Sequence, residues 1–201
     1  NVFVDSGLGT ALVQDKHAGD EEFSTVFYFN MLMSILLYFI MYLISPFIAD
    51  FYNNESLIPI VRVLSITLVV SGLKNVQQAY VSKTLQFKRF FYSTLVGTVG
   101  AAFVGVFIAY KGGGVWALVV QQVFNTTVDA IILWFTVKWR PKLMFSVKKL
   151  IRLLSYGWRL LASSLIDTVY NNARQMIIGK KYSTADLAYY NQGEKFPVLI
   201  A

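Results

Sequence analysis

Polar and charged side chains recur at helical spacing inside long apolar stretches of this sequence. In "SLIDTVYNNARQMIIGK" (Ser164 to Lys180), a carboxylate, two amides and a guanidinium stand among leucine, isoleucine, valine and methionine. Ser163, Asp167, Asn171 and Arg174 are spaced at i, i+4, i+8 and i+11, which predicts that they share one face of a helix. A carboxylate there can carry a proton or Na⁺, and the planar fork of an arginine suits a bidentate phosphate contact.

A second polar stripe lies in the apolar segment from Val115 to Val137. Gln122, Asn125 and Asp129 occur at i, i+3 and i+7, again on one helix face. An aspartate is too short to carry its charge from the middle of a membrane to water, so this face is expected to turn toward an aqueous cavity. The alternative is hydrogen bonding between helices without a transport role. Asp129 and Asp167 are the two candidates for ion coupling.

Three basic residues also fall inside apolar stretches. A charge near the middle of a bilayer costs at least about 2.5 kcal/mol on insertion scales, so each needs a partner or a route to water. Arg62 lies about two turns inside its segment, and both snorkelling and an inward orientation toward substrate remain open. Lys74 and Arg159 lie near the ends of their segments, where snorkelling is expected to carry their charges to the interface.

The composition identifies the kind of protein that must position these side chains. The chain has 201 residues, of which 56% are hydrophobic and 14% are charged, whereas soluble domains average about 25% charged residues. This balance predicts an all-α, polytopic membrane helix bundle. The chain has no cysteine and one histidine, so no disulfide, metal site or cofactor is expected. The net charge of +7 comes from basic residues between the apolar segments, which indicates membrane orientation and no nucleic-acid partner.

Five segments are long enough to cross a hydrocarbon core of about 30 Å as helices. Residues 1–13 and 196–201 look like parts of neighbouring spans, which favours a fragment of a longer protein, and the basic amphipathic stretch 146–161 is expected to lie along the membrane surface before the chain turns into the fifth span. The predicted spans are Thr25–Ala49, Leu57–Val81, Phe90–Tyr110, Val115–Val137 and Tyr156–Gly179.

The distribution of lysine and arginine predicts the orientation. One set of connections carries ten of them (Lys16, Lys83, Lys88, Arg89, Lys138, Arg140, Lys142, Lys148, Lys149 and Arg152), and the other set carries four (Lys111, Lys180, Lys181 and Lys195). The side with ten should be cytoplasmic. Tyrosine and tryptophan are expected at the membrane interfaces, including Tyr110, Trp116, Trp134, Trp139, Tyr156 and Trp158.

Small residues recur every four positions in the third predicted span. Gly97, Ala101, Gly105 and Ala109 would leave a smooth stripe along which another helix can approach closely. Ordinary helix packing is the preferred interpretation of this stripe, ahead of any role with a substrate.

No enzyme signature competes with these polar stripes. The sequence has no glycine-rich phosphate loop, nucleophile elbow or cluster of metal ligands, and "KGGG" (Lys111 to Gly114) is a turn between two spans. The connections are also too short to hold a catalytic domain. The chain is therefore not expected to be an enzyme, and no catalytic residue is nominated.

Several local motifs resemble those of a known family. "DSGLGTALVQ" (residues 5–14), "STVFYFN" (24–30), "LQFKRF" (85–90), "GGGVWALVVQQ" (112–122), "WRPKLMFS" (139–146) and "MIIGKKYSTADLAYYNQGEKF" (176–196) occur in the order and spacing of helix junctions in the family. On these motifs the chain resembles the lipopolysaccharide and polysaccharide flippases of the multidrug/oligosaccharidyl-lipid/polysaccharide exporter superfamily. The resemblance covers essentially the whole chain.

The resemblance implies a two-lobe, MATE-like exporter fold of about twelve to fourteen helices. This chain would supply residues 1–145 to the N-terminal lobe, from the end of helix two through helix six. Residues 146–201 would open the C-terminal lobe with helix seven and the start of helix eight.

The resemblance also implies a function. Such proteins move undecaprenyl-pyrophosphate-linked oligosaccharide across the bacterial inner membrane by alternating access, among membrane lipids and with H⁺ or Na⁺ as suggested coupling ions. The family does not transfer a fixed set of site residues, so the candidates come from their positions in this sequence. For substrate and cavity they are Arg62, Gln122, Asn125, Asp167, Asn171 and Arg174, and for ion coupling Asp129 and Asp167.

Two alternative functions remain at this point. A cation-coupled multidrug antiporter of the same superfamily would favour an acidic, aromatic cavity without arginine. A membrane enzyme of polysaccharide assembly would need a large extracytoplasmic loop, and this stretch has none.

Overall fold

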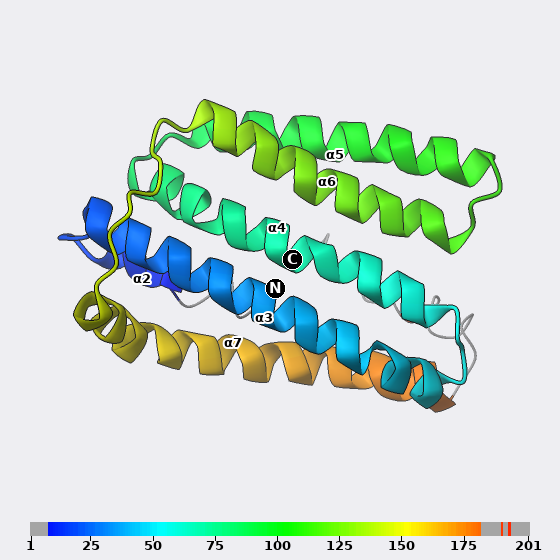
Figure 1. Ribbon diagram of the computed structural model, residues 1–201. Coiled ribbons are helices and arrows are strands. Elements are labelled where there is room, and N and C mark those ends of the chain that lie inside the picture. The colour runs from blue at the N-terminus through cyan, green and yellow to red at the C-terminus, as the bar shows by residue number, and fades with distance from the viewer. Residues whose placement is uncertain (1–7, 182–189, 191–192, 194–201) are drawn as a thin grey trace.

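The computed structural model describes residues 8–181, 190 and 193, and each regular element within the long described range is a helix (Figure 1). Residues 1–7 and the predicted later span 196–201 lie outside the described residues. The elements are α2 (Leu8–Gln14), α3 (Asp20–Tyr52), α4 (Leu57–Lys83), α5 (Phe87–Tyr110), α6 (Val115–Thr136) and α7 (Val147–Lys181).

The helices α3 to α6 lie side by side in the order α3, α4, α6, α5 (Figure 1). Helices that follow one another in the chain run in opposite directions, so the neighbours α4 and α6 are parallel. One side of α4 packs against α3 and the other against α6, while α5 and α6 form a tight hairpin. The short helix α2 lies against α4 and against the start of α7. The three basic connections therefore meet at one end of the bundle, as the predicted orientation requires.

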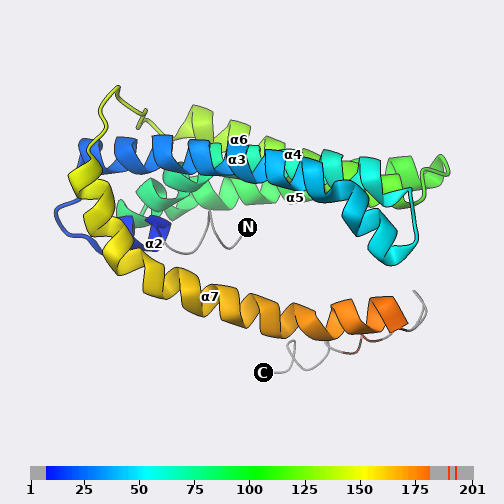
Figure 2. The ribbon, with the colours of Figure 1, turned by 60° about the horizontal axis from the view of Figure 1, so that its bottom comes forward.

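Four described helices, α3 to α6, are long and apolar enough to cross a membrane. The expectation of a multi-pass membrane helix bundle is therefore confirmed. The predicted fifth span is not among these four helices. One continuous helix of 35 residues, α7, includes both the expected surface helix and the expected span, and its first turns run at an angle to the rest (Figure 2). Nothing in this stretch breaks a helix, and the polar residues of the segment keep its hydropathy low.

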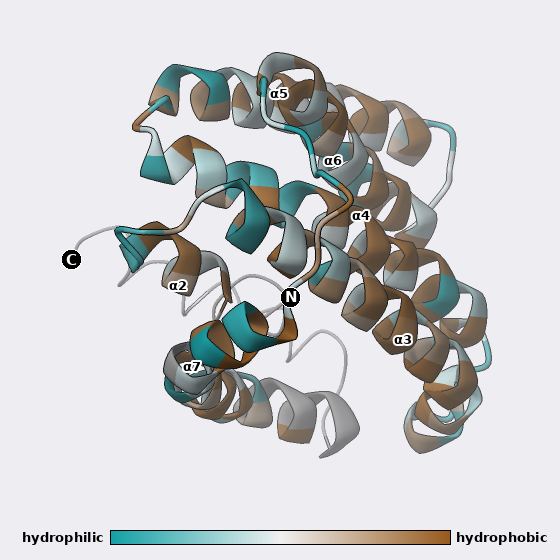
Figure 3. Ribbon diagram, turned by 60° about the vertical axis from the view of Figure 1, so that its left-hand side comes forward, coloured by the Kyte–Doolittle hydropathy of each residue, from teal (hydrophilic) through white to brown (hydrophobic). Residues whose placement is uncertain are grey.

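The buried and exposed faces of the spans are inverted relative to a soluble bundle. In α5 the buried positions are Ser93, Gly97, Ala101 and Gly105, whereas Phe103 is 74% exposed. Figure 3 shows α3 as hydrophobic over most of its length, although it borders the outside of the bundle. Large apolar side chains on the outside and small or polar ones between helices are typical of helices in lipid.

Two close helix contacts depend on glycine. A Cβ on Gly72 of α4 would lie 2.9 Å from Ser34 Cβ and 3.3 Å from the Asn30 carbonyl oxygen of α3. A Cβ on Gly97 of α5 would lie 2.9 Å from Asn125 Oδ1 of α6. The small-residue stripe thus brings α5 against α6, except that its last predicted member, Ala109, is exposed. The buried members of the stripe end at Gly105.

A proline bends the far end of α3. Pro46 lies inside the helix and has no N–H for the carbonyl of Tyr42, one turn earlier. The Ser45 hydroxyl donates to that carbonyl at 2.8 Å. Figure 2 shows the last turns of α3 bending away from the line of the helix. Pro46 thus removes one helical hydrogen bond, and the neighbouring Ser45 supplies another donor for the same carbonyl.

An aromatic cluster closes the opposite end of the bundle. Trp139 packs 5.7 Å from Phe23 and 6.0 Å from Tyr80, measured between ring centroids, and is 6% exposed. Its indole N–H donates to Asp20, and its carbonyl accepts from Gln77. The ring of Trp139 is thus covered by protein at this end of the bundle, and its position at the membrane interface stays a prediction. The connection after α6 folds back over α3 and α4, which buries the ring.

Candidate functional site: a polar groove between α4, α5 and α6

An ion pair lies inside the bundle between two membrane helices. Lys74 Nζ of α4 lies 2.8 Å from Asp129 Oδ2 of α6, and their side chains are 17% and 10% exposed. Snorkelling was the expectation for Lys74, and this contact corrects it. The lysine lies on the face of α4 that packs against α6, so the nearby carboxylate is a closer partner than the interface.

The pair forms part of a polar cavity of about 370 Å³, here called the α4–α6 groove. Three helices line it with three amides, four hydroxyls, one phenyl ring and the two charges. The lining residues are Ser71, Lys74, Gln78, Phe90, Thr94, Thr98, Gln122, Asn125, Thr126 and Asp129. The predicted stripe Gln122, Asn125 and Asp129 thus lines one cavity, together with residues of α4 and α5 that the spacing did not indicate.

The depth of the groove follows from helix geometry. Asp129 lies seven residues before the end of α6 and Lys74 nine residues before the end of α4, which is about 10–14 Å at 1.5 Å per residue. The ion pair therefore lies in the half of the bundle nearest the basic connections. Asp129 therefore lies closer to the predicted cytoplasmic side than its expected position near the middle of the span.

The electrostatics of the groove leave it close to neutral. Lys74 and Asp129 contribute opposite formal charges at hydrogen-bonding distance. The second carboxylate oxygen, Asp129 Oδ1, is buried and accepts no hydrogen bond from the described residues. Such a group costs about 1–3 kcal/mol unless something else donates to it. The groove can therefore receive a hydrogen-bond donor at its floor without changing its net charge.

Arg62 of α4 contacts two residues at the bend of α3. Its Nε donates to Ser45 Oγ at 3.0 Å, and its guanidinium carbon lies 4.1 Å above the ring centre of Tyr42. Within the described part of the chain, no carboxylate pairs with it. These contacts give Arg62 a structural role where Pro46 interrupts the helix, and its contact with substrate stays a prediction.

The polar face of α7 lies apart from the α4–α6 groove. Asp167 is exposed and is not among the residues that line the groove. Asn171 and Arg174 lie on the same helix, but their side chains are outside the described part of the structure. Among the described side chains, those of the α7 stripe do not line the cavity that the α6 stripe lines, and the places of Asn171 and Arg174 stay predictions.

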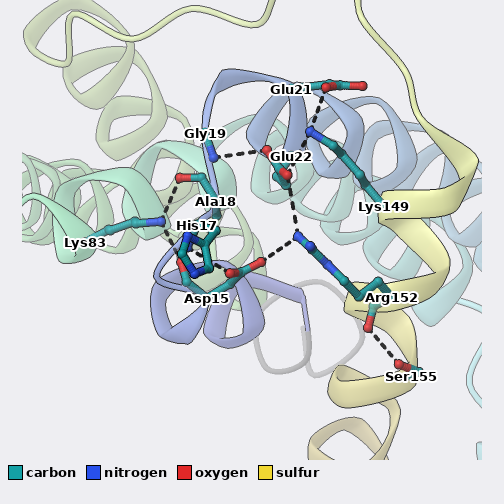
Figure 4. A network of polar contacts seen from close by, with 10 residues as sticks. All are labelled: Asp15, His17, Ala18, Gly19, Glu21, Glu22, Lys83, Lys149, Arg152 and Ser155. Atoms are coloured by element: carbon teal, nitrogen blue, oxygen red, sulfur yellow. Dashed lines mark hydrogen bonds and ion pairs between the residues drawn. The ribbon is translucent and has the colours of Figure 1, made fainter.

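A separate set of charges connects α7 to the start of α3 (Figure 4). We call it the Glu22 network, and it consists of Asp15, Glu21, Glu22, Lys149 and Arg152. Glu22 is 5% exposed, accepts the backbone N–H of Gly19 at 3.0 Å, and lies 2.8 Å from Lys149 Nζ. Arg152 Nη2 reaches Asp15 at 2.7 Å and Glu22 at 3.5 Å.

The Glu22 network favours the charged form of Lys149. Hydrogen bonds to Glu21 and then to Glu22 raise the pKa of the Lys149 ammonium above its usual value, because two carboxylates favour the charged form. Lys149 thus stays a cation at any physiological pH. From the sequence, Lys149 and Arg152 serve only to predict the orientation. In the structure they also hold the start of α7 against α3 and the α2–α3 connection.

The α4 side of the groove also follows a helical periodicity. Ser71, Lys74 and Gln78 lie at i, i+3 and i+7 and line the groove, but of these only Lys74 is singled out from the sequence, as an interfacial residue. The same periodicity that identified the stripe on α6 would have found them. A lysine near a predicted membrane boundary was instead assigned to the interface.

Known proteins with similar sequences place the chain in a family. The pattern of the family described as "Polysaccharide biosynthesis protein" matches residues 1–201. The chain is 28% identical over 195 residues to the teichuronic acid biosynthesis protein TuaB of Bacillus subtilis, covering 94% of this chain and 40% of that protein. No solved structure matches it.

Two further relatives have similar coverage. The lipopolysaccharide biosynthesis protein WzxC of Escherichia coli is 24% identical over 93% of this chain and 38% of its own length. The succinoglycan biosynthesis transport protein ExoT of Rhizobium meliloti is 18% identical over 95% of this chain and 39% of its own length. The chain therefore spans about two fifths of the length of these relatives. Because the family pattern matches the sequence from end to end, the chain belongs to the polysaccharide biosynthesis protein family.

Proposed function

We propose that the protein containing this chain flips lipid-linked oligosaccharide across the bacterial inner membrane for polysaccharide or lipopolysaccharide synthesis. The observation that supports this most directly is the α4–α6 groove, a polar cavity with a buried ion pair inside four apolar helices. Polar groups at such depth mark substrate pathways in membrane proteins. Membership of the polysaccharide biosynthesis family, with a relative named as a transport protein, supplies the substrate class.

The groove supports transport better than catalysis. A membrane enzyme would need a nucleophile or an acid–base pair with access to a donor substrate, whereas the carboxylate here is already paired with a lysine. A cation-coupled drug antiporter of the same superfamily fits the family assignment less well. The protein is thus proposed to move its substrate without chemical change.

In this proposal α7 is the first helix of a second lobe, and residues 1–145 belong to the first. Arg174 and Asn171 would face the substrate from the second lobe, and Arg62 would attract the pyrophosphate from the first. Asp129 and Asp167 are the candidates for coupling to H⁺ or Na⁺. Lipid contacts the large exposed apolar side chains of α3 to α6.

The test is deletion of the full-length gene in its own bacterium, followed by return of the wild-type gene. Deletion should abolish surface polysaccharide and leave complete lipid-linked repeat units accumulating in the cytoplasmic leaflet, where an added periplasmic glycosidase cannot reach them. The returned gene should restore both. If lipid-linked units instead accumulate on the periplasmic side, the protein acts after translocation and the proposal is wrong.

The nominated arginine is tested in the same strain. Arg174→Ala should reduce surface polysaccharide while its abundance in the membrane stays normal. Unchanged surface polysaccharide would remove Arg174 from the substrate path.

A further inference from the structure

We infer that the α4–α6 groove is a subsite for a sugar unit of the substrate and that the pyrophosphate binds elsewhere. The inference rests on the proposed function and assigns one part of the substrate to one cavity. The combination that points to it is a neutralised lysine, an unused carboxylate oxygen and several amides in one polar cavity between three membrane helices.

Charge argues first against a phosphate or a free cation in this groove. Lys74 is the one cation among the lining residues, and Asp129 neutralises it at 2.8 Å. A phosphate would have to displace the carboxylate or lie next to it, with like-charge repulsion in a partly desolvated site. A metal ion or Na⁺ at Asp129 would face the ammonium group of Lys74, so H⁺ remains the coupling ion for Asp129 and Na⁺ coupling is left to Asp167. A neutral ligand meets neither obstacle.

The hydrogen-bonding groups match hydroxyls. Gln78, Gln122 and Asn125 each present donors and an acceptor, and the side chains of Gln122 and Asn125 bond to no other described residue. A sugar hydroxyl both donates and accepts, so it can use both ends of an amide, whereas a phosphate oxygen only accepts. Asp129 Oδ1 lies buried at the floor and still needs a donor, which a hydroxyl supplies.

The shape and the entrance also suit a sugar ring. The volume of about 370 Å³ falls in the range of small-molecule sites. Gln122, Thr94 and Thr98 are exposed, so the groove opens to the outside of the described bundle along α5 and α6. Phe90, 40% exposed at the same cavity, offers an apolar surface to the C–H face of a ring.

The experiment measures binding to the purified full-length protein in detergent by calorimetry. One probe is the lipid-free repeat-unit oligosaccharide released by mild acid from the surface polysaccharide of the same bacterium, and the other is inorganic pyrophosphate. Gln122→Ala and Asn125→Ala should each weaken oligosaccharide binding about three- to tenfold, the effect of one lost hydrogen bond. Asn172→Ala, an exposed amide on α7 that bonds its own helix, is the matched control and should leave binding unchanged.

A charge-neutral double variant separates sugar from phosphate. K74Q/D129N removes both charges and keeps the groove neutral and polar, so oligosaccharide binding should stay within about threefold of wild type. Pyrophosphate binding should be the same in this variant and in the wild type. Loss of pyrophosphate binding in the double variant would assign the groove to an anion and overturn the inference.

A second measurement guards against variants that fold poorly. The chain has no cysteine, so Gln122→Cys and Asn172→Cys can each be labelled with a maleimide after any cysteines elsewhere in the full-length protein are replaced. The oligosaccharide should protect the first position and not the second. Equal labelling with and without oligosaccharide at Gln122→Cys, in a protein that still restores surface polysaccharide, overturns the subsite alone. Failure of the wild-type gene to restore export overturns the proposed function instead.

Discussion

Lys74 and Asp129 lie 55 residues apart in the sequence and 2.8 Å apart in the fold. Each charge makes the other tolerable in an apolar bundle, because an unpaired ion there loses its hydration without compensation. The pair need not add net stability, since two hydrophobic residues of the same volume often do as well. Its retention inside membrane helices is therefore better explained by the site that it forms.

The first prediction concerns this pair. Lys74→Gln leaves Asp129 charged, buried and unpaired, and breaking a fully buried pair costs about 3–5 kcal/mol, an upper limit here. The melting temperature in detergent should fall by several degrees, and K74Q/D129N should recover most of the loss. Equal melting temperatures for the single and double variants would show that the carboxylate gains no stability from Lys74.

Residue spacing in the sequence was sufficient to find one side of the site and insufficient to find the other. The spacing predicts correctly that Gln122, Asn125 and Asp129 share one helix face, because helical periodicity can be counted in the sequence. It cannot place Lys74, because periodicity does not indicate which neighbouring helix a face will contact. The same limit applies to Arg62, whose hydroxyl partner Ser45 lies on another helix.

At the scale of elements, length and hydropathy predicted α3 to α6 to within about five residues at each end. At α7, where the sequence changes from basic amphipathic to apolar, the chain changes direction within one continuous helix (Figure 2). Helices end where the backbone needs another conformation, at a glycine in the left-handed region or before a proline. Gly157 is the one glycine near that point, and it lies within the helix. A change of polarity along a helix is not a boundary.

The second prediction concerns the contact between α3 and α4. Gly72→Ala places a methyl group against Ser34 and the Asn30 carbonyl, and overpacking of this kind typically costs about 1–3 kcal/mol. The melting temperature should fall, and G72A/S34G should restore much of it because the second change removes the obstructing side chain.

Gly9→Ala is the control for this prediction, since a Cβ there meets nothing within 4 Å. It should be neutral or slightly stabilising, as alanine favours the helix. An effect of Gly9→Ala as large as that of Gly72→Ala would mean that backbone flexibility matters here and close packing does not.

At the scale of the whole molecule, two kinds of contact hold the described helices together. Close packing at glycines joins the spans, whereas ion pairs join α7 to the start of α3 and an aromatic cluster joins the connection after α6 to α3 and α4. Glu22 lies at the centre of those charges, with a side chain that is 6% exposed. By contrast, Lys142 and Asp20 form a pair whose side chains are 61% and 47% exposed. We expect the buried contacts of Glu22 to stabilise the fold more than the exposed Lys142–Asp20 pair.

The third prediction compares these two contacts. Glu22→Ala leaves the Gly19 N–H without its acceptor and leaves Lys149 and Arg152 with one carboxylate each, at a cost of about 1–3 kcal/mol. It should lower the melting temperature and speed protease cleavage in the connection 137–146. Lys142→Ala removes an exposed pair worth about 0–1 kcal/mol and should change neither quantity measurably. Equal effects of the two changes would contradict a special role for the Glu22 network.

The uninterrupted length of α7 has a mechanical consequence. The first turns of α7 run at an angle to the rest of the helix (Figure 2), and Leu150 and Leu153 in these turns lie in the described core of the bundle. From Leu154, which packs against that core, to Lys181 the helix extends about 40 Å. A tilt of about 10° at the inner end of this stretch moves its far tip by roughly 7 Å. Small rearrangements of ion pairs near Lys149 would thus be magnified into a displacement of several ångströms at the opposite membrane surface.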